Sequence, residues 1–171
     1  MRNNLSQLIS LSKVEEKLYR PVDAYEQSRV TRMEHVNTTI VENPQEGIAA
    51  VATRIATLIN RRDANGQKTV LSLASGRSMR DLFVELVRKH KEEGLSFKNV
   101  VIFGSYEFYP LADSSMGSMA QIQSQLLNHI DILPENVHTF PGDLPKETIF
   151  AFCEEYEKAI TEAGGIDIQV L

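Results

Sequence analysis

An α/β fold, with helices covering both faces of a parallel sheet, is what this sequence predicts. Short, uninterrupted apolar runs signal buried strands, and they alternate along the chain with longer segments whose apolar residues recur at helical spacing. This β-α-β-α order favours parallel strands joined by right-handed crossovers, in a three-layer Rossmann-like arrangement. With 171 residues, 42% of them hydrophobic and 24% charged, the chain is long enough for one domain with a substantial core.

Residues 1–37 are unlike the rest and are predicted to form an N-terminal helical arm. We expect this arm to pack on the domain or on a neighbouring subunit. A second short helix is predicted within it at residues 24–34, and a short strand follows at residues 38–41. The first helix of the arm ends near Pro21, and its loose apolar pattern consists of Leu5, Leu8, Ile9, Leu11, Val14 and Leu18.

The predicted α/β domain spans residues 38–171, and its first helix begins with a strong start signal. Asn43 is a favourable cap, Pro44 suits the first helical position, and Glu46 stands at the third. The helix is predicted to end before the Asn-Gly turn at residues 65–66. Its buried face is predicted to comprise Ile48, Val51, Ala52, Ile55, Leu58 and Ile59.

Residues 69–86 read as a strand, a tight turn and a helix. The strand covers residues 69–73, and Gly76 in the small polar turn after it is free to take a positive φ. Ser78 is predicted to cap the helix, with Asp81 completing a capping box. The helix is predicted to end at Gly94 after a solvated charged stretch, and to bury Leu82, Phe83, Leu86 and Val87.

The turn at residues 75–78 is a candidate phosphate site. A helix N-terminus that follows a strand offers free N–H groups and the positive end of the helix dipole to an anion. The hydroxyls of Ser75 and Ser78 and the charge of Arg77 sharpen this expectation towards phosphate. On the motif alone, an ordinary connection between strand and helix explains the turn equally well.

Three further strands are predicted at residues 100–103, 137–140 and 166–171, with a helix before each of the last two. The first of these helices is predicted to bury Met116, Met119, Ile122, Leu126, Leu127 and Ile130. The second opens at Pro145, and its predicted inward face comprises Ile149, Phe150, Cys153, Tyr156 and Ile160. Cys153 is therefore expected to be a buried core thiol rather than a nucleophile. Because the chain ends on its last strand, we expect a fragment whose sheet is incomplete at the C-terminus.

Composition argues against several classes of protein. The net charge of −5, from 23 acidic and 18 basic residues, disfavours a general nucleic-acid-binding surface. No apolar run is long enough to span a membrane, and the polar N-terminus is no signal peptide. One cysteine fits a reducing compartment, so a cytoplasmic protein is expected.

No cofactor is expected, and the spacing of the histidines suggests no metal site. His129 and His138 are expected to be structural or surface residues.

Five phrases carry a family resemblance: LSLASGRSMRDLFVEL (71–86), GLSFKNVVIF (94–103), EFYPL (107–111), HIDILPENVHTFPG (129–142) and EEYEKAITEAGGIDIQVL (154–171). Together they resemble the glucosamine-6-phosphate deaminase (isomerase) family, within the wider group of sugar-phosphate isomerases and 6-phosphogluconolactonases. The likeness covers residues 38–171, and the combination is specific although no single phrase is. The arm before residue 38 is similar to longer bacterial relatives, some of which carry a further domain.

In that family the turn after the first strand holds the sugar phosphate. The resemblance therefore implies Ser75, Gly76, Arg77 and Ser78 as the phosphate-binding positions, and a small-molecule sugar phosphate as the partner. The family usually has a second Gly and a Pro where this chain has Arg77 and Met79. Arg77 either adds a charge to the phosphate or fills the space that the glycine leaves open, and we favour retained anion binding.

The chain departs from the family at the end of the next strand. The family reads Asn-Met-Asp-Glu-Tyr there, with the Asp as the base that moves a proton during isomerisation, whereas residues 104–108 read Gly-Ser-Tyr-Glu-Phe. Tyr106 stands at the base position, and an ordinary tyrosine pKa of about 10 makes it a poor base at neutral pH.

Glu107 is no obvious substitute for the base, because neighbouring side chains on an extended segment point apart. A carboxylate that ties the loop to a backbone N–H or to a cation is the more expected role for Glu107. The family's remaining catalytic residues lie in a glycine-rich stretch with a His just after the last strand, beyond Leu171.

The resemblance implies one of two functions. In the first, the chain is the N-terminal fragment of a deaminase-like enzyme of amino-sugar metabolism, and it is inactive as a fragment. In the alternative, Tyr106 marks a protein that has lost the chemistry and serves as a sugar-phosphate-binding or regulatory module. A generic nucleotide-binding domain is less favoured, because no GxGxxG follows the first strand. Family enzymes often form oligomers, so a homo-oligomer is a candidate state.

Overall fold

A computed structural model describes residues 23–25, 38–111 and 113–171 of the chain. The chain divides into two units, residues 1–40 and residues 41–171, and the fold presented here is that of the second. The predicted N-terminal arm lies outside the described residues except for residues 23–25. The strand predicted at residues 38–41 is wrong: these residues are exposed and form no regular structure, so their β-branched side chains have no sheet to join.

Four parallel strands form one sheet in the order β3-β2-β1-β4. The first two are β1 (Thr69–Leu73) and β2 (Val100–Gly104), and the outer two are β3 (Val137–His138) and β4 (Ile168–Val170). The predicted strands at 137–140 and 166–171 are therefore shorter than expected. Leu71 of β1 lies opposite both Ile102 and Ile168, so β1 lies between β2 and β4. The chain adds β2 and β3 on one side of β1 and then returns to add β4 on the other side, which makes the boundary between β1 and β4 a topological switch point. Ligands of open parallel sheets bind outside the carboxyl ends of strands at such a switch point.

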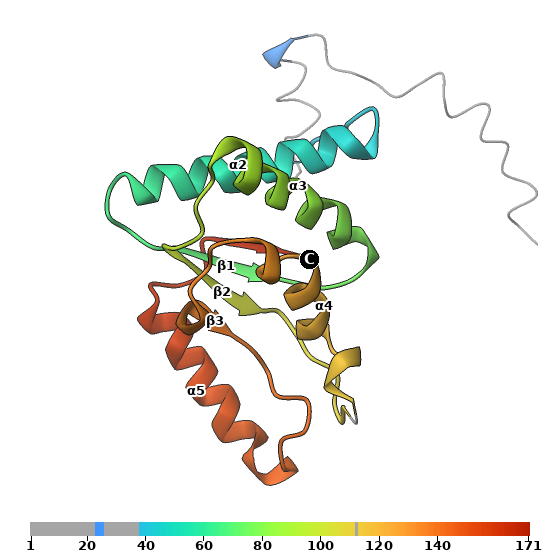
Figure 1. Cartoon of the computed structure of the whole chain (residues 1–171), viewed down its shortest axis with the longest axis vertical. Coiled ribbons are helices and arrows are strands. Elements are labelled where there is room, and N and C mark those ends of the chain that lie inside the picture. Colours follow the sequence, from blue (N-terminus) through green and yellow to red (C-terminus); the bar gives the residue numbers. More distant parts are fainter. Residues whose placement is uncertain (1–22, 26–37, 112) are drawn as a thin grey trace, which may run out of the picture. The chain divides into compact units, whose positions relative to one another are not determined.

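Helices cover both faces of the sheet, which confirms the predicted three-layer α/β fold (Figure 1). Helices α2 (Pro44–Asp63) and α3 (Arg77–Glu93) lie over one face, and α5 (Ile149–Glu162) lies over the other. The larger core contains Ile55, Phe83, Leu71, Ile102 and Ile122, and the smaller core contains Val70, Val101, Phe103 and Tyr156. Alternate residues of β1 and β2 thus enter opposite cores, because successive strand side chains point to opposite faces.

The predicted start of α2 is confirmed. The side chain of Asn43 accepts a hydrogen bond of 2.9 Å from the backbone N–H of Glu46, and Pro44 is the first helical residue. The carboxylate of Glu46 in turn accepts from the backbone N–H of Glu42 at 3.2 Å. Of the predicted buried face, Ala52, Ile55 and Ile59 are buried, whereas Val51 is exposed.

Helix α3 begins two residues earlier than predicted, and Ser78 is not its cap. Gly76 is the N-cap residue, with φ of +123°, and no side chain caps the first turn. Since Gly76 carries the chain from the strand into the helix, Ser78 becomes the second helical residue and is exposed. The predicted end at Gly94, in the left-handed conformation with φ of +74°, is confirmed.

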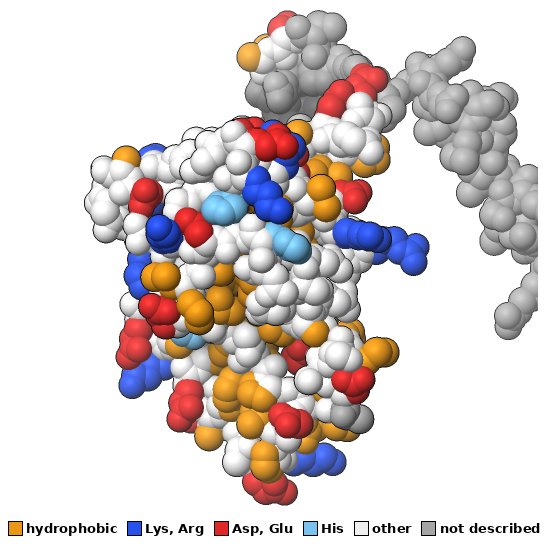
Figure 2. Space-filling view, in the orientation of Figure 1, with side chains coloured by type: hydrophobic (Ala, Val, Ile, Leu, Met, Phe, Trp, Pro, Cys, Tyr) orange, Lys and Arg blue, Asp and Glu red, His pale blue; other side chains and the backbone are white. Residues whose placement is uncertain are grey.

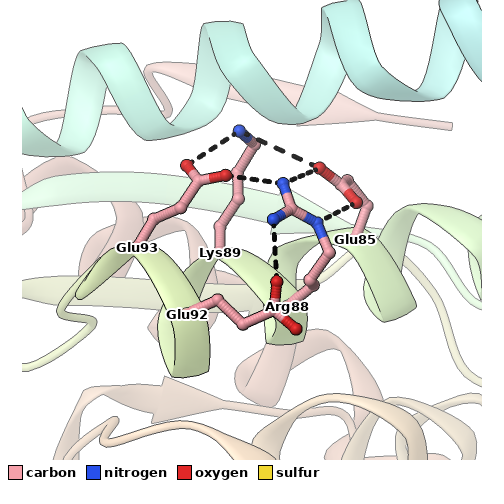
Figure 3. Close-up of polar contacts among 5 residues, drawn as sticks. All are labelled: Glu85, Arg88, Lys89, Glu92 and Glu93. Atoms are coloured by element: carbon pink, nitrogen blue, oxygen red, sulfur yellow. Dashed lines mark hydrogen bonds and ion pairs between the residues drawn. The ribbon is translucent and has the colours of Figure 1, made fainter.

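A charged network of five side chains lies along the second half of α3 (Figure 3). Arg88 bonds Glu85 at 2.7 Å, Glu92 at 3.1 Å and Glu93 at 2.6 Å. Its hydrogen bonds lower the pKa of Glu85 and of Glu93. Lys89 is buried rather than solvated, and its ammonium lies 3.2 Å from the Glu93 carboxylate. All five side chains satisfy one another, so this network is a structural feature of the helix surface rather than a ligand site.

The helix predicted from Met116 to Ile130 is broken into pieces. A 3₁₀ turn at Ser114–Met116 precedes α4 (Ser118–Gln125), and a second 3₁₀ turn follows at Leu127–His129. Ile122, Leu126 and Leu127 are buried as predicted, but Met116 is exposed, because α4 begins only after it.

Helix α5 presents a different face to the sheet from the predicted one. Two apolar stripes share Tyr156 and Ile160, which pack in the core as predicted, and the sheet buries the stripe that also contains Phe152, Ala159 and Ala163. Phe150 is 84% exposed and Cys153 is exposed, so the prediction of a core thiol is wrong. The ring of Phe140 packs on both Phe152 and Tyr156, and this contact favours burial of the stripe that contains Phe152.

Candidate functional site

The turn after β1 and the loop after β2 meet at the carboxyl edge of the sheet. The backbone N–H of Ser105 donates to the carbonyl of Leu73 at 2.9 Å, and the hydroxyls of Ser72 and Ser105 lie 2.9 Å apart. Ala74 donates its N–H to the carbonyl of Val170 on β4 at 3.1 Å. The candidate turn at residues 75–78 therefore lies at the switch point between β1 and β4, where ligands of such sheets bind.

The turn exposes the first turn of α3 to a ligand. Most N–H groups at the start of a helix have no intrahelical partner. In α3 the N–H of Met79 donates to the carbonyl of Gly76 at 3.2 Å, and the first turn has neither a capping side chain nor an acidic residue. Arg77 and Ser78 are exposed there, whereas Ser75 is only 8% exposed. Free N–H groups, the dipole end and one guanidinium make this turn suited to an anion.

Tyr106 closes on the turn from the loop after β2. Its hydroxyl lies 3.0 Å from the hydroxyl of Ser75 and donates to the carbonyl of Ser75 at 3.2 Å. Tyr106 is 39% exposed, and its ring packs edge-on against Phe108 with centroids 5.7 Å apart. The residue at the predicted base position is thus hydrogen-bonded to the predicted phosphate turn, an arrangement that suits binding better than proton abstraction.

Glu107 points away from the turn and binds the start of α4. Its carboxylate accepts hydrogen bonds from the backbone N–H groups of Ser118 at 2.7 Å, Met119 at 3.0 Å and Phe108 at 2.9 Å. A carboxylate at a helix N-terminus satisfies orphan donors and opposes the dipole. The loop-tying role expected of Glu107 is therefore present in the structure, with backbone N–H groups as the partners.

Two glycines that the sequence analysis did not single out hold these loops together. A Cβ atom at Gly117 would lie 2.8 Å from the Glu107 carboxylate, and one at Gly142 would lie 2.5 Å from the Cβ of Leu111. Leu111 donates its backbone N–H to the carbonyl of Gly142 at 2.7 Å. At Gly142 the close approach of a Cβ and a backbone oxygen requires glycine, whereas a side chain at Gly117 would have to displace the Glu107 carboxylate; no local sequence signal reveals either constraint.

An apolar groove of about 380 Å³ lies between these loops and α5. Figure 2 shows hydrophobic side chains gathered there, on the face that it presents. The groove was also missed by sequence analysis, although the aromatic residues of the EFYPL phrase were a signal. Its lining comprises Tyr106, Glu107, Phe108, Tyr109, Phe140, Pro141, Leu144, Ile149, Phe152 and Cys153.

A second concave region, of about 470 Å³, lies between α2 and β4. Arg54, Arg61 and Arg62 line it, and Arg62 is paired with Asp167 just before β4. Because Asp167 precedes the strand, this hollow lies at the amino end of β4. It is therefore away from the carboxyl edge that carries the turn, and we place the candidate site at the turn.

His129 and His138, the two histidines expected to be structural or surface residues, contact neighbouring parts of the fold. His138 stacks on Phe103 with centroids 4.3 Å apart, and burial, with a smaller contribution from the charge of Lys68, lowers its pKa. A ring nitrogen of His129 lies 3.0 Å from the carbonyl of Ser124. Among the described residues, no group of three or more His, Cys, Asp or Glu side chains could hold a metal ion, and no helix is long and apolar enough to cross a membrane.

Comparison with known proteins shows a consistent likeness. The family described as glucosamine-6-phosphate isomerases/6-phosphogluconolactonase matches residues 42–171. A glucosamine-6-phosphate deaminase-like protein of Bacteroides thetaiotaomicron is 43% identical over 172 aligned positions, which cover all of this chain and 26% of that protein. A glucosamine-6-phosphate deaminase of Porphyromonas gingivalis is 41% identical over 100 positions, 58% of this chain and 37% of that protein. The matched segments thus span 26% and 37% of these two relatives' own lengths.

Two solved structures share the fold. A monomeric glucosamine-6-phosphate deaminase superposes with a TM-score of 0.71 at 24% identity, over 78% of this chain and 54% of its own. The 6-phosphogluconolactonase of Thermotoga maritima superposes with a TM-score of 0.58 at 25% identity, over 71% of this chain and 53% of its own. The likeness to the Bacteroides protein also includes the residues before 42, which the family match does not reach.

Proposed function

Because the chain belongs to the family of glucosamine-6-phosphate isomerases and 6-phosphogluconolactonases, we propose that it is the sugar-phosphate-binding part of a deaminase-like protein of amino-sugar metabolism. The observation that carries the proposal is the uncapped first turn of α3, at the switch point of the sheet, with Ser75, Gly76, Arg77 and Ser78 around it. The phosphate of the sugar binds the N–H groups of this turn, and Arg77 adds a charge to it.

Ser78→Ala tests the phosphate site. The exposed hydroxyl of Ser78 stands on the second helical residue and does not cap the helix, so its removal leaves the fold intact. Loss of one hydrogen bond to a charged phosphate is expected to weaken binding of glucosamine 6-phosphate about tenfold, as measured by isothermal titration calorimetry.

Two controls accompany that measurement. Ser124→Ala removes an exposed hydroxyl from α4 and is expected to leave the affinity unchanged, and unphosphorylated glucosamine is expected to bind far more weakly than its 6-phosphate. An unchanged affinity in Ser78→Ala would place the phosphate elsewhere.

The chain by itself is expected to release no ammonia from glucosamine 6-phosphate. The phenol of Tyr106 is hydrogen-bonded to Ser75, and the neighbouring carboxylate of Glu107 is bound to three backbone N–H groups, so neither is poised to take a proton from carbon. A coupled ammonia assay at substrate saturation measures this. Any release that scales with protein concentration contradicts the prediction.

One observation favours the non-catalytic alternative, a sugar-phosphate-binding or regulatory module. The hydroxyl of Tyr106, the residue that the resemblance places at the base position, is hydrogen-bonded to Ser75, which supports a binding role over proton abstraction. The longer parent protein separates the two functions: ammonia release supports an enzyme, whereas saturable binding without turnover supports a module. Restoration of turnover by Tyr106→Asp in an inactive parent would assign the loss of chemistry to this residue.

The remaining features of the proposal rest on the sequence. A cytoplasmic location is supported by the use of one cysteine. The division into an arm at residues 1–37 and an α/β domain at residues 38–171, the possible homo-oligomer and the absence of a nucleic-acid partner stay predictions.

A further inference from the structure

The peptide group between Ser75 and Gly76 sets the direction of the first N–H group of the candidate phosphate turn. Gly76 has a φ of +123°, a conformation that residues with a side chain rarely adopt. Among the described residues, none accepts a hydrogen bond from the N–H of Gly76, Arg77 or Ser78. These three donors are therefore available to an anion, and the orientation of the peptide group decides where the first of them points.

Tyr106 holds this peptide group from the loop after β2. Its hydroxyl donates to the carbonyl of Ser75 at 3.2 Å and lies 3.0 Å from the Ser75 hydroxyl. A phenol has one proton, so while that proton is donated to the carbonyl, the Ser75 hydroxyl donates its own proton to the phenol oxygen. Ser75 is also buried. Its hydroxyl therefore serves the contact with Tyr106 rather than a ligand.

The bond from Tyr106 fixes the direction of the Gly76 N–H as well as that of the Ser75 carbonyl. The peptide between them is trans, and the C=O and N–H of a trans peptide point in opposite directions. A rotation of this peptide group would break the bond to the phenol and turn the carbonyl towards the side on which the N–H now lies. An N–H attracts a phosphate oxygen, whereas a carbonyl oxygen repels it. The Tyr106 hydroxyl thus keeps a donor at this position.

The loop after β2 presents Tyr106 from a segment that is attached on both sides of it. Before Tyr106, the hydroxyl of Ser105 lies 2.9 Å from the hydroxyl of Ser72 on β1. After it, the carboxylate of Glu107 is bound to three backbone N–H groups. The Tyr106 ring itself packs edge-on against Phe108. A hydroxyl supported in this way is able to hold a neighbouring group in one orientation.

We propose that Tyr106 is a positioning residue of the phosphate site, whose hydroxyl holds the peptide group between Ser75 and Gly76 so that the Gly76 N–H is directed at the phosphate. Tyr106 acts through this peptide group and does not itself contact the phosphate. The inference rests on the proposed function, since it takes the turn at residues 75–78 as the phosphate site. It gives a role in binding to the residue at the predicted base position.

Tyr106→Phe removes the hydroxyl and keeps the ring. The variant is expected to bind glucosamine 6-phosphate, measured by titration calorimetry, and inorganic phosphate, measured by NMR titration, each about fivefold more weakly than the unaltered chain. Tyr109→Phe removes a hydroxyl of the same loop that bonds the carbonyl of Leu144 instead, and is expected to leave both affinities unchanged. Unchanged affinities in Tyr106→Phe, or equal losses in the two variants, overturn the inference. Failure of the unaltered chain to bind either ligand overturns the proposed function together with it.

Two further measurements separate positioning of the peptide group from other roles of Tyr106. The amide proton of Gly76 is expected to shift downfield when inorganic phosphate binds the unaltered chain, and by less than about half as much in Tyr106→Phe, because a charge-assisted hydrogen bond is weakened. An equal shift in both overturns the inference. Ser75→Ala keeps the backbone carbonyl, so Tyr106→Phe is expected to cost about the same fivefold in that background. If the cost disappeared there, Tyr106 would act through the Ser75 hydroxyl, and the inference would be wrong.

Discussion

Tyr156→Ala is expected to lower the free energy of unfolding by about 3–5 kcal/mol, the range for removal of a large buried aromatic side chain. Tyr156 is buried between α5 and the sheet, where its ring stacks on Phe140 at 4.1 Å and meets Phe103 edge-on at 5.4 Å. Its hydroxyl donates to the carbonyls of Gly104 at 2.9 Å and His138 at 3.2 Å. Burial raises the pKa of this hydroxyl, so it remains a donor at neutral pH. Urea unfolding followed by circular dichroism measures the change.

Two further variants divide the effect of Tyr156 into its parts. Tyr156→Phe keeps the ring and is expected to cost only about 1–2 kcal/mol, from the lost hydrogen bonds. Phe150→Ala on the same helix, where the ring is exposed, is expected to change stability by less than about 0.5 kcal/mol. If Tyr156→Ala were no more destabilising than Phe150→Ala, the assignment of the Tyr156 face of α5 as the buried face would be wrong.

Glu107→Ala is expected to lower the free energy of unfolding by about 2–3 kcal/mol, because it leaves three backbone N–H groups without their charged acceptor. Two of these groups, on Ser118 and Met119, begin α4. Their amide hydrogens are expected to exchange with solvent much faster in the variant, and hydrogen-exchange NMR measures this at each residue. Because the loop that carries Tyr106 loses its attachment to α4, affinity for the phosphosugar is expected to fall as well.

The matched control is Glu154→Ala, which removes an exposed carboxylate from α5 and is expected to be nearly neutral. Glu107→Gln keeps an acceptor oxygen of the same reach and is expected to lie between the two. Unchanged exchange at Ser118 and Met119 in Glu107→Ala would show that the carboxylate does not cap α4.

Local signals were sufficient for much of the fold. The central strands at residues 69–73 and 100–104 are largely apolar runs without strict alternation, a pattern typical of strands that are buried on both faces of a parallel sheet between helices. The start of α2 at Asn43 and the end of α3 at Gly94 are specified by one or two residues each. The turn after β1 was also predictable, since a strand, a glycine and a helix follow one another within ten residues.

Local signals failed where two patterns competed. Ser and Gly are both residue types that occur at helix N-caps, and in the structure Gly76 rather than Ser78 is the N-cap of α3. Helix α5 carries two overlapping apolar stripes, and the ring of Phe140, ten or more residues away in the chain, selected the one that contains Phe152. The exposure of Cys153 follows from that selection.

The sequence by itself determined the class of fold and the strand, glycine and helix that form the turn at residues 75–78, because each depends on residues adjacent in the chain; anion binding at this turn and Tyr106 at the family's base position stay predictions. Only the tertiary structure decided that Tyr106 contacts Ser75, that Glu107 caps α4 and that five aromatic rings enclose a groove beside the turn. These contacts join residues 11 to 46 positions apart, and their geometry is set by how the sheet and its helices pack together rather than by any local preference of the chain.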